Sequence, residues 1–218
     1  MGMWAQPQLR GEPITYDVPT PSGLKGMLVS IFAKPEFEWI IKRIWVLKPI
    51  QHYTYQWTSL TEGNPYTDDR TLRTATVLVD VDYVFEATIR VNKLRSSRSE
   101  HSYLAEIRRR MEKRQERKKP YFGWTEFFAD WELVARPETL PPPINLTRQF
   151  GSVLWDMVPI DLKKDRFYPV FFNASMEDGC IEVPAALAER YLPAFFQERN
   201  RAHPVSTVDA EALDLEGA

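Results

Sequence analysis

The sequence predicts an α+β protein: a ferredoxin-like domain over residues 1–136, followed by a small antiparallel β unit. Up to residue 136, the apolar patterns change between helix and strand periods in the order helix, strand, strand, helix, strand. This αββαβ order is that of a ferredoxin-like βαββαβ unit whose first strand is weak or absent. Residues 137–145, PETLPPPIN, then form a proline-rich linker, and short strand patterns follow it over 146–198.

The composition excludes several classes of protein. The chain has 218 residues, 44% of them hydrophobic, which is enough for one large domain or two small ones. Its single cysteine, Cys180, cannot form an internal disulfide, which fits a reducing cytosol. No run of about 18 apolar residues occurs, so we expect a cytoplasmic protein without a membrane-spanning helix. The net charge of −2 excludes a bulk polyanion binder, so any nucleic-acid site must be local.

The first predicted helix begins after Thr20, a good N-cap, and Pro21 suits its first turn. Gly23 and Gly26 lower the stability of this helix. Their expected use is close approach of the backbone to another element or to a phosphate. Lys25 lies between them and is therefore a candidate RNA-binding residue.

Two strands are predicted next. Residues 36–50 are β-branched and aromatic, and their apolar phase changes near Lys42, which predicts a β-bulge there. Residues 75–91 carry apolar side chains at every odd position, the clearest strand pattern in the chain. Asp80 and Asp82 fall on the outer face of this strand. Two carboxylates without a third ligand indicate a solvated face rather than a metal site, and we expect no cofactor.

Residues 51–74, between these strands, are polar with interleaved aromatic rings. The segment is too long for a tight turn, so an extended loop or hairpin is expected. Its rings could stack on the bases of a nucleic acid, or half of them could pack onto the sheet. The candidate RNA-binding residues in and beside it are Lys48, His52, Tyr55, Trp57 and Arg73.

A basic helix is predicted between Ser97 and Gly123. Ser97 and Glu100 have the spacing of a capping box at its start. Residues 108–119 carry eight Lys and Arg side chains against two Glu, a net charge of +6. Such a run is either a solvated helix face or a surface for phosphates, because clustered cations neutralise a nucleic-acid backbone. The candidates for phosphate binding are Arg108, Arg109, Arg110, Lys113, Arg114, Arg117, Lys118 and Lys119.

The rest of the chain is predicted from shorter patterns. A strand candidate at 125–135 completes the αββαβ order. After the linker, strands are predicted at 152–158, 167–174 and 180–184, with a turn at 176–179 and a short helix at 185–197. The tail, residues 199–218, is expected to be acidic and disordered.

Several stretches, taken in order, carry a family resemblance: YDVPTPSGLKGMLVSIFAKP, WIIKRIWVLKPIQ, ATVLVDVDYVFEATI, the basic helix and PYFGWTEF. They resemble the fifth Cas subunit of the CRISPR Cascade complex, type I-C (Dvulg subtype), in the RAMP superfamily. The resemblance covers most of residues 4–185, and MWAQPQLRG is similar to the opening motif of the wider fifth-subunit family. It implies a RAMP or RRM-like fold with a protruding thumb hairpin, for which residues 51–74 stand in the right place.

The resemblance implies two activities. Such a subunit binds the repeat-derived 5′ handle of CRISPR RNA beside the Cascade backbone and large subunits, with a possible DNA contact in the complex. In type I-C systems, which lack a separate processing enzyme, it is also the metal-independent endoribonuclease that cuts precursor CRISPR RNA and leaves a 2′,3′-cyclic phosphate. The alternative is an inactive structural subunit that only holds the 5′ handle.

The candidate catalytic residues match this family only in part. Cleavage without a metal uses the 2′-hydroxyl of the RNA and needs a base, a cation and an acid. His101, at the start of the basic helix, suits acid or base work. The resemblance implies a tyrosine where Phe32 stands and a lysine where Glu100 stands, so only the histidine matches. Glu100 could orient His101, and the candidates for replacing the missing groups are Lys34, Tyr16 and Arg98.

The start of the chain is a second departure from the family. The family begins with a core strand ahead of the motif that MWAQP resembles, whereas this sequence begins almost at the motif. Either a partner element or a rearranged edge completes the sheet, or the start has been misplaced and the chain is short. An unfilled sheet position would expose backbone and apolar surface, so we expect the protein to depend on partner subunits.

Overall fold

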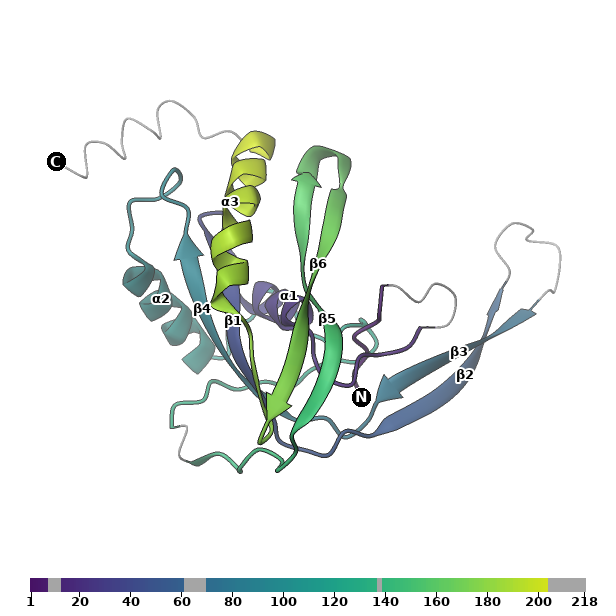
Figure 1. Ribbon diagram of the computed structural model, residues 1–218. Coiled ribbons are helices and arrows are strands. Elements are labelled where there is room, and N and C mark those ends of the chain that lie inside the picture. The colour runs from purple at the N-terminus through teal and green to yellow at the C-terminus, as the bar shows by residue number, and fades with distance from the viewer. Residues whose placement is uncertain (8–12, 61–69, 137–138, 204–218) are drawn as a thin grey trace.

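The computed structural model describes residues 1–7, 13–60, 70–136 and 139–203 (Figure 1). Over these ranges the protein is a mixed α+β structure, which confirms the predicted class. The elements, in chain order, are α1 (Pro21–Ile31), β1 (Phe37–Val46), β2 (His52–Leu60), β3 (Arg70–Leu78), β4 (Tyr83–Val91), α2 (Glu100–Glu112), β5 (Arg148–Asp161), the 3₁₀ turn η2 (Leu162–Lys164), β6 (Arg166–Glu177), β7 (Cys180–Glu182) and α3 (Ala185–Ala202). No helix in the described ranges is long and apolar enough to cross a membrane.

The main sheet has the strand order β4-β1-β7-β6-β5, and each neighbouring pair is antiparallel. The strands before and after the proline-rich segment 137–145 therefore share one sheet, because β7 pairs with β1 along Arg43–Trp45. One cluster of buried side chains also extends over both parts of the chain. The C-terminal strands thus extend the sheet that β1 and β4 begin.

The predicted strand at 125–135 is wrong. This segment forms only an isolated bridge, between Tyr121 and Phe128, and the sheet position beside β1 is taken by β7 instead. Its apolar residues pack in two different cores: Ala129 is buried in the main core, whereas Phe127 packs against Met3 and its neighbours. The sheet order therefore does not confirm the ferredoxin-like arrangement.

The strand predicted over 75–91 is in fact two strands. β3 ends at Leu78 and β4 begins at Tyr83, because Asp80 adopts the left-handed conformation (φ 48°) between them. The alternation hides this turn, because both strands bury odd-numbered residues. Asp80 and Asp82 lie in the connection rather than on the outer face of a strand.

The predicted start of α1 and the predicted bulge in β1 are confirmed. The Thr20 hydroxyl accepts a hydrogen bond from the Gly23 N–H at 3.1 Å, and the β1–β4 register shifts between Ile41 and Arg43. Gly23 also allows a close approach, because a Cβ there would lie 2.5 Å from the Trp4 ring. At Gly26 no described residue lies within 4 Å of the Cβ position, so no such element approaches it, and approach of a phosphate stays a prediction.

The basic helix is shorter than predicted. Its N-cap is Ser99, not Ser97, and α2 ends at Glu112, close to the left-handed Arg114 (φ 50°). Residues 113–119 therefore lie beyond the helix. The backbone N–H groups of Arg117 and Lys118 donate to carbonyls in the last turn of α1, at 3.1 and 2.9 Å. This basic segment joins the C-terminal ends of the two helices.

α3 is longer than predicted and runs to Ala202, so residues 199–202 are helical rather than part of a tail. Residues 204–218, the rest of the expected tail, lie outside the described residues. The helix packs against β5 and β1, as Figure 1 shows.

β2 and β3 form a separate antiparallel hairpin that extends away from the main sheet (Figure 1). Its root is closed by a second small core, in which the fully buried Met3, Ala75 and Val77 contact Trp124 and Phe127. The connection at 61–69 lies outside the described residues.

Gly123 holds the N-terminal strand segment in place. It has a positive φ of 79°, and a Cβ there would lie 1.7 Å from the Met3 carbonyl oxygen. The neighbouring Phe122 carbonyl accepts a hydrogen bond from the Met3 N–H at 2.9 Å. The glycine is therefore required by backbone conformation and by space.

We expect Gly123→Ala to destabilise the protein much more than Gly151→Ala. Gly151 has a similar φ of 72° but nothing within 4 Å of its Cβ position, so its substitution costs about 1–2 kcal/mol of left-handed strain alone. Gly123→Ala adds the clash with Met3. Thermal unfolding of the two variants measures the difference, and equal melting temperatures would contradict this account.

Candidate nucleic-acid interface

A cleft of about 360 Å³ lies where the end of α1 meets the end of α2 and the basic segment. Ile31–Lys34 line one side of it. The other side is formed by Arg110 and residues 115–117. Three of the lining residues are cations, which makes the cleft a candidate for binding a phosphate.

Glu106 forms ion pairs with three cations beside this cleft. Its Oε2 lies 3.0 Å from Lys34 Nζ and 3.1 Å from Arg98 Nη1, and its Oε1 lies 3.8 Å from Arg110 Nε. Burial alone would raise the pKa of Glu106, but the hydrogen bonds and charges of Lys34 and Arg98 hold it below its ordinary value. One carboxylate therefore positions three cations, and a net positive charge remains.

Phe32 lines the cleft at the position where the resemblance implies a tyrosine. Its ring is buried, stacks on Phe37 at 5.9 Å, and has no hydroxyl to offer. Arg110 and Lys34 lie over it, at 4.9 and 5.6 Å from the ring centroid. The chain thus places two cations beside the position of the missing hydroxyl.

His101 is exposed on the first turn of α2. Its side chain makes no hydrogen bond or ion pair within the part of the chain that the structure describes. Glu106 lies five positions further along the helix, which is about 140° around the helix axis from His101. His101 and Lys34 therefore lie on different sides of α2.

Glu100 does not orient His101. Its Oε1 lies 3.5 Å from Arg90 Nε and 3.4 Å from the Val91 N–H, so the carboxylate is turned toward the end of β4. Tyr16 is also absent from the cleft. It is buried in the main core, where its backbone N–H donates to the Trp4 carbonyl.

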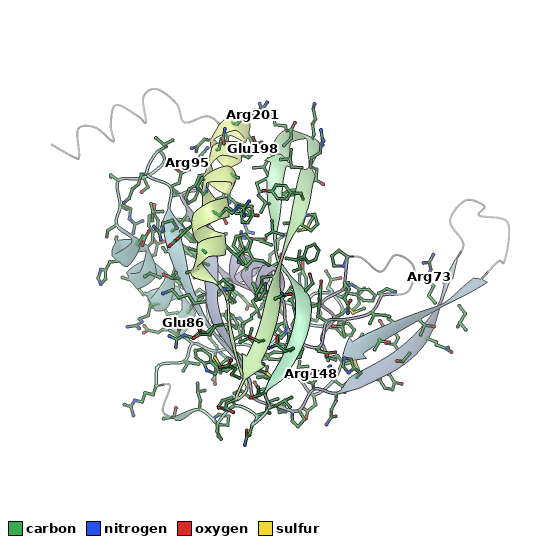
Figure 2. The ribbon with its side chains drawn as sticks, viewed as in Figure 1. Arg73, Glu86, Arg95, Arg148, Glu198 and Arg201 are labelled. Carbon is green, nitrogen blue, oxygen red and sulfur yellow. The ribbon has the colours of Figure 1, made fainter. Side chains whose placement is uncertain are left out.

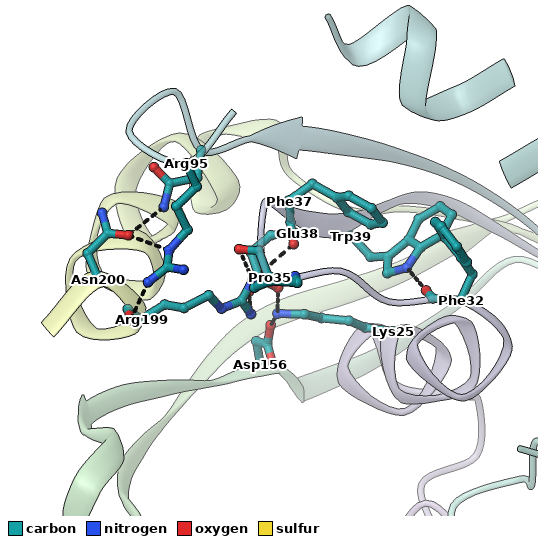
Figure 3. Close-up of polar contacts among 11 residues, drawn as sticks. Lys25, Phe32, Pro35, Phe37, Glu38, Trp39, Arg95, Asp156, Arg199 and Asn200 are labelled. Atoms are coloured by element: carbon teal, nitrogen blue, oxygen red, sulfur yellow. Dashed lines mark hydrogen bonds and ion pairs between the residues drawn. The ribbon is translucent and has the colours of Figure 1, made fainter. Parts of the chain in front are cut away.

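Lys25, a candidate RNA-binding residue, lies inside the protein. Its Nζ is 2.7 Å from Asp156 and 3.2 Å from Glu38, and 4.0 Å from the centroid of the Phe195 ring (Figure 3). Burial would lower the pKa of Lys25, but the two carboxylates outweigh it and raise that pKa. A charge neutralised in this way is not presented to RNA.

Arg199 completes this buried ion network from α3. It pairs with Glu38 and donates to the carbonyls of Pro35 and Phe37, at 3.1 and 3.0 Å (Figure 3). The network is structural, because Glu38 and Asp156 are buried carboxylates that need cations.

The hairpin candidates differ in their surroundings. Lys48 Nζ pairs with Asp80 at 2.6 Å, and His52 Nε2 lies 3.0 Å from Asp17. Tyr55 is half-buried against the small core, and burial raises its pKa. Arg73 is exposed on the hairpin (Figure 2), opposite Trp57 in the register. The side chain of Trp57 lies outside the described residues.

The basic helix end and segment present a cationic surface. Arg114 donates to the Trp131 carbonyl at 2.8 Å, and Lys119 Nζ lies 5.1 Å from the centroid of the Phe128 ring. Apart from Arg110, which pairs with Glu106, the other cations of residues 108–119 are exposed and form no ion pair with any described residue. This cationic surface consists of Arg108, Arg109, Lys113, Arg117 and Lys118.

Sequence reasoning missed Glu106 and the exposed Phe128. Glu106 is a single carboxylate just before the basic run, and only the fold brings Lys34, 72 residues away, to it. Phe128 falls within the segment predicted as a strand. Its exposure follows from the absence of that strand.

A run of exposed cations without ion pairs to any described residue, beside a cationic cleft, is the charge pattern expected of a protein that binds a polyanion such as RNA. The chain belongs to the Cas5 family of CRISPR-associated proteins, in its Cas5d (type I-C) branch, because residues 1–184 match the family model described as CRISPR-associated protein (Cas_Cas5).

Two curated relatives support this assignment. CRISPR pre-crRNA endoribonuclease Cas5d of Mannheimia succiniciproducens is 32% identical over 207 residues, 85% of this chain and 92% of the relative. The protein of the same name from Thermus thermophilus is 30% identical over 219 residues, 91% of this chain and 93% of the relative.

Solved structures agree on the fold. SMU1763c of Streptococcus mutans matches with a TM-score of 0.60 and 20% identity, over 84% of this chain and 87% of that one. A CRISPR-associated protein matches with a TM-score of 0.59 and 20% identity, over 79% and 83% of the two chains.

We expect Lys25→Met to lower the free energy of unfolding by about 3–5 kcal/mol, because it leaves the buried Asp156 without its cation and Glu38 with Arg199 alone. Lys48→Met removes the same charge from an exposed pair and serves as the matched control, with little effect. Denaturant unfolding measures both. Similar stabilities for the two variants would show that the buried ion network does not hold the fold.

Proposed function

We propose that this chain binds the repeat-derived 5′ handle of CRISPR RNA and cuts precursor CRISPR RNA without a metal ion. The observation that carries the proposal is the cationic surface, with its five unpaired cations next to the cleft. The names of the two curated relatives, which match most of the chain, support the cutting activity. The Cascade backbone and large subunits are its proposed partners, and the β2–β3 hairpin is its proposed thumb on a variant of the RAMP fold.

The reaction needs no group beyond those of the protein and the RNA. The 2′-oxygen attacks the adjacent phosphorus, the 2′,3′-cyclic phosphate forms, and the bond to the 5′-oxygen breaks. One proton leaves the 2′-hydroxyl and one reaches the 5′-oxygen. His101 is the residue proposed for one of these transfers, because it is exposed and histidine is the side chain used most often in general acid–base catalysis.

The negative charge that develops on the phosphate is proposed to lie at the start of α2. The free N–H groups of this helix end favour an anion, and Arg98 precedes the N-cap. Arg110 lies about 14 Å from His101 along the helix axis, too far for both to contact one phosphate. Lys34 and Arg110 therefore hold a neighbouring phosphate, in the cleft. His101 and the cleft thus contact different phosphates of one strand.

A structural subunit that holds the handle without cutting is the second candidate. Two positions favour it: Phe32 has no hydroxyl, and Glu100 pairs with Arg90 where the resemblance implies a lysine. Both candidates use the cationic surface in the same way, and only the first needs His101.

We expect the protein to cut its cognate repeat RNA in EDTA, and His101→Ala to lose about 10²–10⁴-fold in rate. His203→Ala, at the other exposed histidine at a helix end, is the matched control and keeps full activity. Single-turnover cleavage of labelled RNA measures both. Wild-type protein that binds the RNA but leaves it intact supports the second candidate, and equal rates for His101→Ala rule out His101.

We expect the double variant Lys113→Glu and Lys118→Glu to bind repeat RNA more weakly and to depend less on salt. Each lost contact to a single-stranded phosphate reduces the slope of log K against log salt by about 0.7. The control reverses two exposed, unpaired lysines elsewhere, Lys93 and Lys163. Fluorescence anisotropy at several salt concentrations compares the pairs, and identical slopes would exclude the cationic surface as the RNA contact.

A further inference from the structure

Two aromatic side chains project into solvent directly after the basic segment. Phe128 is 62% exposed and Tyr121 is 36% exposed, and the two residues form an antiparallel bridge. The flanking hydrogen bonds run from the Phe122 N–H to the Phe127 carbonyl and from the Ala129 N–H to the Pro120 carbonyl. This pattern makes Tyr121 and Phe128 a non-hydrogen-bonded pair, in which side chains project to one side and lie closest together.

The backbone under these rings is firmly held. Trp124 and Phe127, between them in the chain, stack on each other and pack on the small core at the root of the β2–β3 hairpin. Ala129 is buried in the main core, and the Phe122 carbonyl binds the Met3 N–H. The exposure of the two rings is therefore not a frayed end.

Single exposed apolar residues are common and need no function. This pair differs in its neighbours, because Lys118 and Lys119 immediately precede it. Lys119 Nζ lies 5.1 Å from the centroid of the Phe128 ring, and Lys118 belongs to the cationic surface. Aromatic faces beside unpaired cations match the two parts of a nucleotide, its flat base and its phosphate.

We propose that Phe128 and Tyr121 form a stacking platform for one unpaired base of the bound RNA, whose phosphate is held by Lys118 and Lys119. This inference rests on the proposed function, because it takes RNA to be the ligand of the cationic surface. A lysine beside the Phe128 ring favours RNA over an apolar protein partner, which would remove the Lys119 ammonium from water without pairing it. Stacking gives affinity that does not depend on the base sequence.

The test is binding of a repeat RNA made uncleavable by a 2′-deoxy substitution, measured by fluorescence anisotropy in EDTA. Phe128→Ala is expected to weaken binding about fivefold to a hundredfold, the range for loss of one base–aromatic stack. The slope against salt stays unchanged, because no phosphate contact is lost. Phe128→Trp keeps the stack and binds within about twofold of wild type. Leu94→Ala, which removes another exposed apolar side chain, is the matched control.

A second arm locates the base. Abasic sites are placed one at a time along the RNA, and each is bound by wild type and by Phe128→Ala. One position is expected to weaken wild-type binding while having no further effect in the variant, because both changes remove the same contact.

The outcomes separate the two proposals. Phe128→Ala that binds like Leu94→Ala, or an abasic penalty that never depends on Phe128, overturns the platform while the proposed function stands. Wild-type protein that does not prefer repeat RNA to a scrambled RNA of equal composition overturns the proposed function itself. Circular dichroism and thermal unfolding show whether each variant is folded, and Phe128→Trp keeps the comparison valid if Phe128→Ala is not.

Discussion

The burial of Glu38 in β1 is the constraint on which much of this structure depends. A carboxylate removed from water needs cations at contact distance, and here they come from distant parts of the chain. Lys25 reaches it from α1 and Arg199 from α3, while Asp156 of β5 shares the Lys25 ammonium. Since no single element satisfies Glu38, both helices and the two strands are fixed relative to one another.

This arrangement also fixes both ends of α2, the helix that carries the proposed RNA-binding groups. In the connection between β4 and α2, Asn92 donates to the Asn200 side chain at 3.0 Å. Arg95 donates to Asn200 Oδ1 at 2.6 Å (Figure 3). Arg95 also donates to the Arg199 carbonyl, which accepts the backbone N–H of His203 as well. At the other end, the basic segment binds the last turn of α1. Cations that repel one another are thus held close together by backbone hydrogen bonds.

The sequence predicts the individual helices and strands better than it predicts which elements and side chains contact one another. The Thr20 cap, the bulge near Lys42 and the C-terminal strands follow from local chemistry and were foreseeable. Alternation alone could not show the turn at Asp80, because the odd-numbered positions stay buried on both sides of it. Nor could composition show that Lys25 is buried, because its two carboxylates are nearby only in the folded chain. The basic run was foreseeable as a surface, whereas the role of Glu106 depends on a contact with Lys34 that no local pattern encodes.

The pairing of β1 with β7 has a consequence for synthesis on the ribosome. β1 pairs with β4 on one side, but the strand for its other side, β7 (Cys180–Glu182), is made only after α2, β5 and β6. Until then the nascent chain has an open strand edge and lacks Arg199, the second cation of Glu38. The sheet therefore closes only after β7 has been made, and the incomplete chain has an edge that a chaperone or another nascent chain can bind.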